Sequence, residues 1–353
     1  MYYKYPISDV HIHAFHTADA NNTIKMVEEL GYEHFVMLST CSIDPEAIGN
    51  NLLCAYTKLA SKGKGYAFAA VHYPEIGVPT AEDMLSQVKL YHELGFDGIK
   101  MMDGKPAMRK LIGVPLDDPC FDPMFSFMEE MDIPLLYHVN DPDEFWTWEL
   151  MPEWAKADGD RLFYGRGDYP TKQEIENEAV RILDKHPKLR VIFPHFFFTS
   201  TNYDRTKYLL DTYPNLLYDI TPGWEMFESF AQDYDRWRQF FIDYSHKILF
   251  GTDTISPHWR DTVGSLRRVM ETDEEFVAFE ENCKGLKLDG ESLENIYKNN
   301  FDKYLPNAPR NMDVNGLLNY AKTLEKRWEA LVHCNKNLAK QSVLDAVKLI
   351  HEL

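Results

Sequence analysis

Two histidines separated by one residue, His11 and His13, stand near the start of the chain in the stretch "SDVHIHAF". On a β-strand successive side chains point to opposite faces, so these two imidazoles face the same way and Ile12 faces the other. Two neutral imidazoles on one face can bind a single metal ion. An isolated His-x-His is equally compatible with one buried, hydrogen-bonded histidine and one incidental histidine.

Further residues with metal-binding or acid–base chemistry occur in later apolar stretches of the chain. Lys100 lies in "FDGIKMM", His138 in "IPLLYHV", His195 in "LRVIFPHFF" and Asp253 in "KILFGTDT". Burying several histidines and an aspartate in one place is costly unless a cation is bound there. If these stretches are neighbouring strands, their polar ends predict a metal centre.

Short apolar, β-branched or aromatic runs recur eight times, at residues 6–15, 33–40, 65–73, 96–102, 133–139, 189–197, 216–221 and 247–254. The segments between them have helical periodicity. Thr171 and Glu174 form a capping box, a helix is predicted to begin at Thr80 and end at Gly95, and Asp122 is the expected N-cap of another helix.

Strand and helix alternate eight times, and the strands are apolar enough to be buried on both faces. This pattern predicts the α/β class and a (β/α)₈ TIM barrel over about residues 6–305, with its chemistry at the C-terminal ends of the strands. An open, doubly wound sheet is the alternative. The chain lacks a Gly-x-Gly-x-x-Gly after the first strand and a Gly-x-x-x-x-Gly-Lys loop, so nucleotide binding has no support.

The composition limits the partners of this 353-residue chain. Its formal net charge of -19 argues against wrapping nucleic acid or docking on an anionic membrane, which leaves a small-molecule substrate and a possible homo-oligomer. Five cysteines without a Cys-x-x-Cys pair predict reduced thiols. The N-terminus has no signal-peptide pattern, and no apolar run approaches the ~18 residues of a spanning helix. We therefore expect a cytoplasmic protein.

Several stretches together resemble one family over roughly residues 6–305. They are "DVHIH", "YHVN", "HPKLRVIFPHF", "LLYDIT", "FGTD" and "LENIYKNNFDKYL". In this strand order they are similar to the amidohydrolase superfamily, and most of all to its amidohydrolase-2 group. The members of that group are metal-dependent hydrolases and non-oxidative decarboxylases.

The resemblance implies roles for particular residues. His11, His13, His138 and Asp253 would bind one divalent cation, most often zinc, and Asp253 would also move the proton of an activated water. His195 would lie beside the substrate as an electrophile or acid–base group.

Lys100 is the ambiguous position of the resemblance. In dinuclear branches a lysine on the fourth strand is carboxylated and bridges two metals. A lysine there can instead pair with Asp253 or bind a substrate carboxylate. We expect one metal ion.

The segment after the fifth strand, residues 140–170, is much longer than the usual connection of about 2–6 residues and is rich in aromatic side chains, which predicts a lid. Within it, and near the ends of strands 3 and 8, six residues are candidate substrate contacts that are also compatible with purely structural roles. They are Trp146, Trp148, Tyr164, Arg166, His72 and His258.

The pattern changes after the barrel. We expect a barrel domain over residues 1–311 and a helical extension over 312–353. In the extension Leu317, Tyr320, Ala321, Leu324 and Trp328 form one apolar stripe, which should pack on the barrel or on a second subunit.

Three functions follow from these observations. The leading prediction is a hydrolase in which metal-activated water attacks an ester, lactone or amide carbonyl of a small, carboxylated substrate. The second is a metal-dependent decarboxylase of an aromatic or enol acid, which His-x-His disfavours because decarboxylases of this group often have Glu-x-His. The third is a non-catalytic binding barrel.

Overall fold

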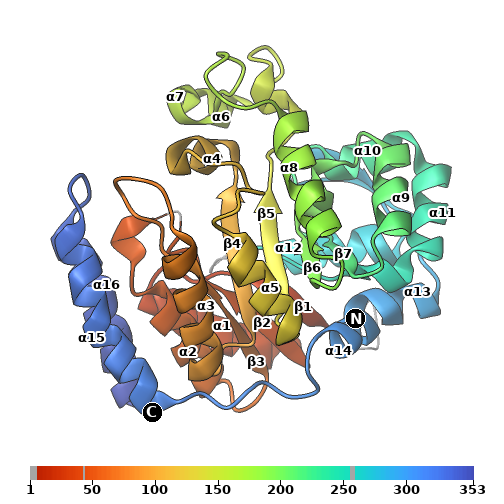
Figure 1. Cartoon of the computed structure of the whole chain (residues 1–353). Helices are drawn as coiled ribbons and strands as arrows, with labels where there is room; N and C mark the ends of the chain where they lie inside the picture. Colours follow the sequence, from red (N-terminus) through yellow and green to blue (C-terminus); the bar gives the residue numbers. More distant parts are fainter. Residues whose placement is uncertain (1–5, 43, 255–258) are drawn as a thin grey trace.

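The computed structural model describes residues 6–42, 44–254 and 259–353, so His258 lies outside the described residues. Its centre is a sheet of eight parallel strands (Figure 1). The strands are β1 (Ser8–Ile12), β2 (His34–Leu38), β3 (Gly65–Ala70), β4 (Gly98–Gly104), β5 (Leu135–Val139), β6 (Val191–Phe193), β7 (Leu216–Asp219) and β8 (Ile248–Leu249).

The strands pair in chain order, and the last returns to the first. The backbone N–H of Val10 donates to the carbonyl of Phe250 at 2.9 Å, and Ile12 forms a parallel bridge with Thr254. These contacts close the sheet, so the predicted (β/α)₈ barrel is confirmed. Because every strand is parallel, the C-terminal ends of all eight meet at one rim.

The barrel interior is filled by alternate residues of the strands. Val36 and Leu38 of β2 belong to the same buried cluster as Tyr66 and Phe68 of β3, and Phe301 of α14 (Asn300–Tyr304) completes it. The intervening residues pack against the surrounding helices, as both faces of the sheet are covered.

The helices follow the strands around the barrel. They include α1 (Thr17–Leu30), α2 (Asn50–Ala60), α3 (Ala81–Leu94), α4 (Pro106–Ile112), α5 (Asp122–Glu130), α8 (Lys172–Lys185), α9 (Tyr203–Thr212), α10 (Met226–Gln232), α11 (Tyr234–Asp243), α12 (Trp259–Glu271) and α13 (Gly290–Glu294).

The predicted helix ends are mostly confirmed. Thr171 and Glu174 form the capping box of α8. Thr80 caps α3, which ends at Gly95 in the left-handed conformation, with φ of 93°. The expectation for Asp122 was wrong, because Asp122 is already the first residue of α5 and Phe121 occupies the N-cap position.

Two segments depart from the simple barrel. Residues 140–170 form the 3₁₀ turn η2 (Asp143–Trp146), α6 (Glu153–Lys156) and α7 (Gly159–Leu162), and both helices lie above the ends of β4 and β5 in Figure 1. A hairpin of β9 (Glu275–Ala278) and β10 (Glu281–Lys284) follows α12 and packs on α10.

The chain ends in two helices that lie side by side at the edge of the barrel, α15 (Val314–Ala330) and α16 (Lys336–His351) (Figure 1). All five residues of the predicted stripe are buried, and α15 and α16 contact α3 and α2. The hydroxyl of Tyr320 lies 3.0 Å from His72 Nε2 and accepts a hydrogen bond from Asn51 Nδ2 at 3.1 Å.

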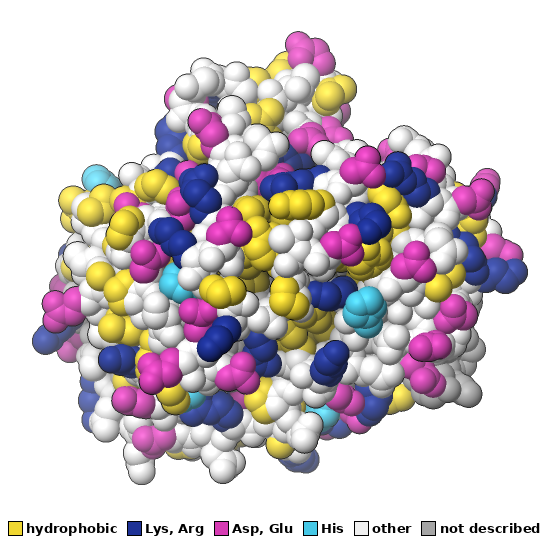
Figure 2. All heavy atoms as spheres, turned by 45° about the vertical axis from the view of Figure 1, so that its right-hand side comes forward, with side chains coloured by type: hydrophobic (Ala, Val, Ile, Leu, Met, Phe, Trp, Pro, Cys, Tyr) yellow, Lys and Arg dark blue, Asp and Glu magenta, His cyan; other side chains and the backbone are white. Residues whose placement is uncertain are grey.

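Lysine and arginine side chains are intermingled with aspartate and glutamate on the face shown in Figure 2, with no broad basic patch in that view. No helix in the described part of the chain is both long and apolar enough to cross a bilayer.

We predict that Leu324→Ala lowers the free energy of unfolding by about 2–5 kcal/mol, because the side chain is fully buried and its removal leaves a cavity between α15 and the barrel. Leu338→Ala in α16 is the matched control, since Leu338 is 52% exposed. Urea denaturation of both variants measures the difference. Equal stability of the two would contradict the packing described here.

Candidate metal centre

The C-terminal rim of the barrel surrounds a cavity of about 520 Å³, called the mouth below. It is lined by residues of the strand ends, of the 140–170 segment and of the hairpin: His11, His13, Phe15, Thr40, Met102, Lys105, His138, Asp141, Pro142, Phe145, Trp154, Arg161, Leu162, His195, Phe198, Pro222, Gly223, Trp224, Asp253 and Phe279. Four histidines and two aspartates therefore meet in a largely aromatic cavity.

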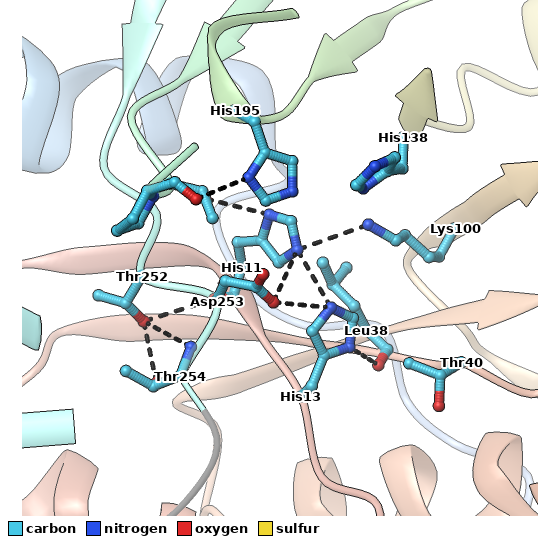
Figure 3. Close-up of polar contacts among 12 residues, drawn as sticks. His11, His13, Leu38, Thr40, Lys100, His138, His195, Thr252, Asp253 and Thr254 are labelled. Carbon is cyan, nitrogen blue, oxygen red and sulfur yellow. Dashed lines mark hydrogen bonds and ion pairs between the residues drawn. The ribbon is translucent and has the colours of Figure 1, made fainter. Parts of the chain in front are cut away.

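Three of these residues form a compact cluster (Figure 3). The Nε2 atoms of His11 and His13 are 3.1 Å apart, and Asp253 Oδ1 lies 3.5 Å from the first and 3.3 Å from the second. Both imidazoles are buried, whereas the Asp253 side chain is 37% exposed. The cluster is therefore open to the mouth on its carboxylate side.

The hydrogen bonds of the two imidazoles decide which ring nitrogens carry protons. His11 Nδ1 lies 2.9 Å from Asp219 Oδ2, and His13 Nδ1 lies 2.9 Å from the carbonyl of Leu38. Both partners only accept, so both Nδ1 atoms carry the proton and both Nε2 atoms present lone pairs. Burial lowers the pKa of each imidazole well below its usual value, which keeps both neutral.

Two lone pairs and a carboxylate oxygen thus converge without a hydrogen between them. This arrangement is repulsive by itself and becomes favourable around a cation. Two imidazole nitrogens and one carboxylate oxygen are ligands that suit Zn²⁺ and other divalent transition metals. The donor set therefore fits a divalent metal ion.

The orientation of His11 depends on a residue that the sequence analysis missed. Asp219, the last residue of β7, is fully buried, and its Oδ2 accepts from His11 while its Oδ1 accepts from the backbone N–H groups of His195 and Thr221. Such a carboxylate fixes the tautomer of a ligand imidazole and increases its basicity. The sequence does contain an indication of this role, because Asp219 is an ionisable residue within the apolar run "LLYDIT".

Several residues of the mouth have a strained, left-handed backbone, among them Asp253 and His195. Asp253 has φ of 52° and His195 φ of 55°, and Phe196, Phe197 and Phe198 continue in the left-handed region. Each such residue costs about 1–2 kcal/mol, which the surrounding structure has to offset. The Asp253 N–H donates to the carbonyl of His11 at 2.8 Å, so the closure of the barrel holds this conformation.

His138 and Lys100 lie beside the cluster rather than in it. Among the described residues, the group of three or more ligand-type side chains with atoms within 4.8 Å of one another consists of His11, His13 and Asp253. His138 Nε2 is 3.1 Å from the carbonyl of Asn140 and 3.2 Å from Lys105 Nζ. Lys100 is fully buried with Nζ 3.5 Å from His11 Nε2, and burial lowers its pKa. The roles of His138 and Lys100 toward a metal stay predictions.

His195 stacks on Phe198 and lies edge-on to His138, with ring centres 4.7 Å apart. Its Nδ1 is 3.1 Å from the carbonyl of Pro222, so Nδ1 carries the proton and Nε2 the lone pair. Burial lowers its pKa well below the usual value. Neutral His195 can therefore accept a proton or bind a metal through Nε2. The electrophilic role would require His195 to donate a hydrogen bond from Nε2, and this tautomer has no proton there.

The predicted contacts of the 140–170 segment do not line the mouth. Trp146 donates to the carbonyl of Pro170, Trp148 packs on Phe163, and Arg166 donates to the carbonyl of Gly159. Tyr164 is 1% exposed and packs in the small core of the segment. These side chains stabilise the fold of the 140–170 segment itself, so each of them has a structural role.

Other residues of the segment enter the mouth instead, namely Phe145, Trp154, Arg161 and Leu162. Which residues enter the mouth depends on the turns of η2, α6 and α7, which hydrophobic periodicity in the sequence does not predict. His72 faces the extension, where it contacts Tyr320, so it is also absent from the mouth.

A protein-family model described as amidohydrolase, of the Amidohydro_2 type, matches residues 43–300. The chain belongs to this amidohydrolase family. The match spans β3 to β8, including His138, His195 and Asp253, and begins after the His-x-His of β1. Membership supports an enzyme and confirms the predicted resemblance. No curated protein matches the chain.

Solved structures share the fold of this amidohydrolase. An uncharacterized TIM-barrel protein from Bordetella bronchiseptica is 13% identical with a TM-score of 0.50, covering 85% of this chain and 98% of its own. A protein proposed to be a 2-pyrone-4,6-dicarboxylic acid hydrolase from Pseudomonas putida is 10% identical with a TM-score of 0.51, and the match covers 86% of this chain and 98% of the other. A 2,6-dihydroxybenzoate decarboxylase is 14% identical with a TM-score of 0.50, and the match covers 85% of this chain and 99% of the other.

We predict that Asp219→Asn lowers the affinity for a divalent metal by about 10–100-fold, since the amide no longer fixes the His11 tautomer through a charged acceptor. Titration of metal-stripped protein with Zn²⁺ measures this affinity. Asp211→Asn on the exposed surface of α9 is the control and should bind as the parent does. An unchanged affinity in Asp219→Asn would show that this carboxylate does not support the site.

Proposed function

We propose that this protein is a metal-dependent hydrolase that attacks an ester, lactone or amide carbonyl of a small, carboxylated substrate. The observation that carries the proposal is the convergence of His11 Nε2, His13 Nε2 and Asp253 Oδ1 at the open end of the barrel. A divalent cation bound by these atoms would lower the pKa of a bound water to about 7 and polarise the carbonyl.

The side chains around the cluster would supply proton transfer and the orientation of the metal-binding imidazole. Asp253 is the partly exposed member, so its second oxygen can take a proton from the attacking water and pass it to the leaving group. The Nε2 lone pair of His195 supplies a second proton acceptor at the mouth. Asp219 keeps His11 oriented throughout, because its two oxygens are held by three partners, one on β1 and the others just after β6 and β7.

The aromatic walls of the mouth suit a planar substrate. Phe15, Phe198, Trp154, Trp224 and Phe279 present aromatic surfaces, and Trp154 lies edge-on to Trp224 with ring centres 5.9 Å apart. Aromatic walls bury a flat molecule without demanding hydrogen bonds from it.

Purified, metal-loaded protein tested on a panel of esters, lactones, amides and hydroxybenzoates, with CO₂ detection, separates hydrolysis from decarboxylation. We expect turnover of at least one carboxylated ester or lactone, and loss of that turnover in Asp253→Asn. Release of CO₂ from an aromatic acid, with no hydrolysis of any ester, lactone or amide, would replace the proposal by a decarboxylase. Absence of stoichiometric metal would favour a binding barrel.

The number of metal ions is tested by metal analysis of His195→Asn and Lys100→Ala beside the parent. With one ion, His195→Asn should keep the metal and lose about 10²-fold or more in turnover, as expected for a missing proton acceptor. If carboxylated Lys100 bridges two ions, either variant should lose metal. A parent with about two ions and a variant with about one would reject the mononuclear assignment.

A further inference from the structure

Lys105 is a cation of the mouth that the sequence analysis did not single out. It follows β4 directly and precedes Pro106 at the start of α4. Its Nζ lies 2.8 Å from Asp141 Oδ1 and 3.2 Å from His138 Nε2, and the side chain is 27% exposed. An ammonium has three N–H donors, and the described residues offer acceptors to no more than two of them, Asp141 Oδ1 and, in the tautomer whose Nε2 carries a lone pair, His138. The third is available to a ligand.

The other cations near the mouth are less suited to bind a ligand. Lys100 is fully buried below the cluster and does not line the mouth. Arg161 lines the mouth from α7, but its side chain is 71% exposed and pairs with Asp158 of the same turn. Among the residues that the structure describes, Lys105 is therefore the cation that is both fixed in position and accessible from the mouth.

The partner of Lys105 has a second anchor. Asp141 is 5% exposed on its side chain, and its Oδ2 accepts a hydrogen bond from the Tyr164 hydroxyl at 2.7 Å. A buried carboxylate that loses its only partner is strongly destabilised. Because the Tyr164 hydroxyl still donates a hydrogen bond to Asp141, Lys105 can turn toward another anion without leaving this carboxylate without a partner.

We propose that Lys105 is a specificity-determining residue that binds the carboxylate of the substrate, and that Asp141 is an internal competitor which the substrate displaces from it. The inference rests on the proposed function, since the anion is the carboxylated substrate. It assigns Tyr164 a positioning role, through Asp141, in place of the direct substrate contact that the sequence suggested. Substrates that carry a carboxylate are then selected over neutral ones of the same shape.

The test is equilibrium binding of benzoate and its neutral analogue benzamide to the protein as purified, measured by calorimetry with the metal content of each variant recorded. We expect Lys105→Met to weaken benzoate binding by about tenfold or more, as for a lost hydrogen bond to a charged group, and to leave benzamide binding unchanged. Asp141→Asn should strengthen benzoate binding, because the competing charge is removed. Lys110→Met is the control, since Lys110 pairs with Asp168 outside the mouth.

Equal benzoate affinities of Lys105→Met and the parent, weaker binding to Asp141→Asn, or no saturable benzoate binding to the parent would each overturn the inference. Lys105→Gln serves as a second variant if Lys105→Met does not fold, as judged by its melting temperature. Benzoate binding that depends on Lys105, in a protein that hydrolyses no ester, lactone or amide, would refute the proposed function and leave the inference standing.

Discussion

The site depends on three electron-pair donors that face one another with no proton between them. His11 and His13 both use Nδ1 to donate to fixed acceptors, so their Nε2 lone pairs point together, and Asp253 adds a negative oxygen at 3.3–3.5 Å. Such a cluster cannot be relaxed by a small rotation of one ring, because each ring is held at its other nitrogen. The protein thus maintains a repulsive arrangement that a divalent cation would stabilise.

The barrel supplies the rigidity for this arrangement. Asp253 follows β8 and is held against β1 by its own backbone hydrogen bond to His11, in a left-handed conformation that is unfavourable in isolation. Asp219 joins β7 to His11 and to the backbone of His195. The closure of the sheet and the orientation of the histidines therefore depend on each other.

The segments added to the barrel decide what can enter the mouth. The 140–170 segment folds around its own small core and places Phe145 and Trp154 over the rim, while the β9–β10 hairpin contributes Phe279. Phe279 stacks on Phe227 of α10 with ring centres 5.0 Å apart. In the proposed function, substrate recognition would therefore fall to these two added segments, and the ends of the parallel strands would carry the reactive groups.

The sequence by itself determined the fold class and the residues that meet at the rim. Eight apolar runs separated by helical segments leave few arrangements other than a closed barrel, and a barrel places the ends of β1, β5, β6 and β8 together whatever the details. This is why His11, His13, His138, His195 and Asp253 could all be placed in one cavity from their positions along the strands.

Only the tertiary structure decided which of these residues touch and in which protonation state. The tautomer of His11 follows from its contact with Asp219, which is distant in the sequence. The tautomer of His195 follows from the carbonyl of Pro222, which lies in a loop without hydrophobic periodicity. The orientation of Trp148 and the exposure of Lys105 depend on how short helices pack on one another. Such contacts are set by side-chain packing over long sequence separations, which hydrophobic periodicity does not encode.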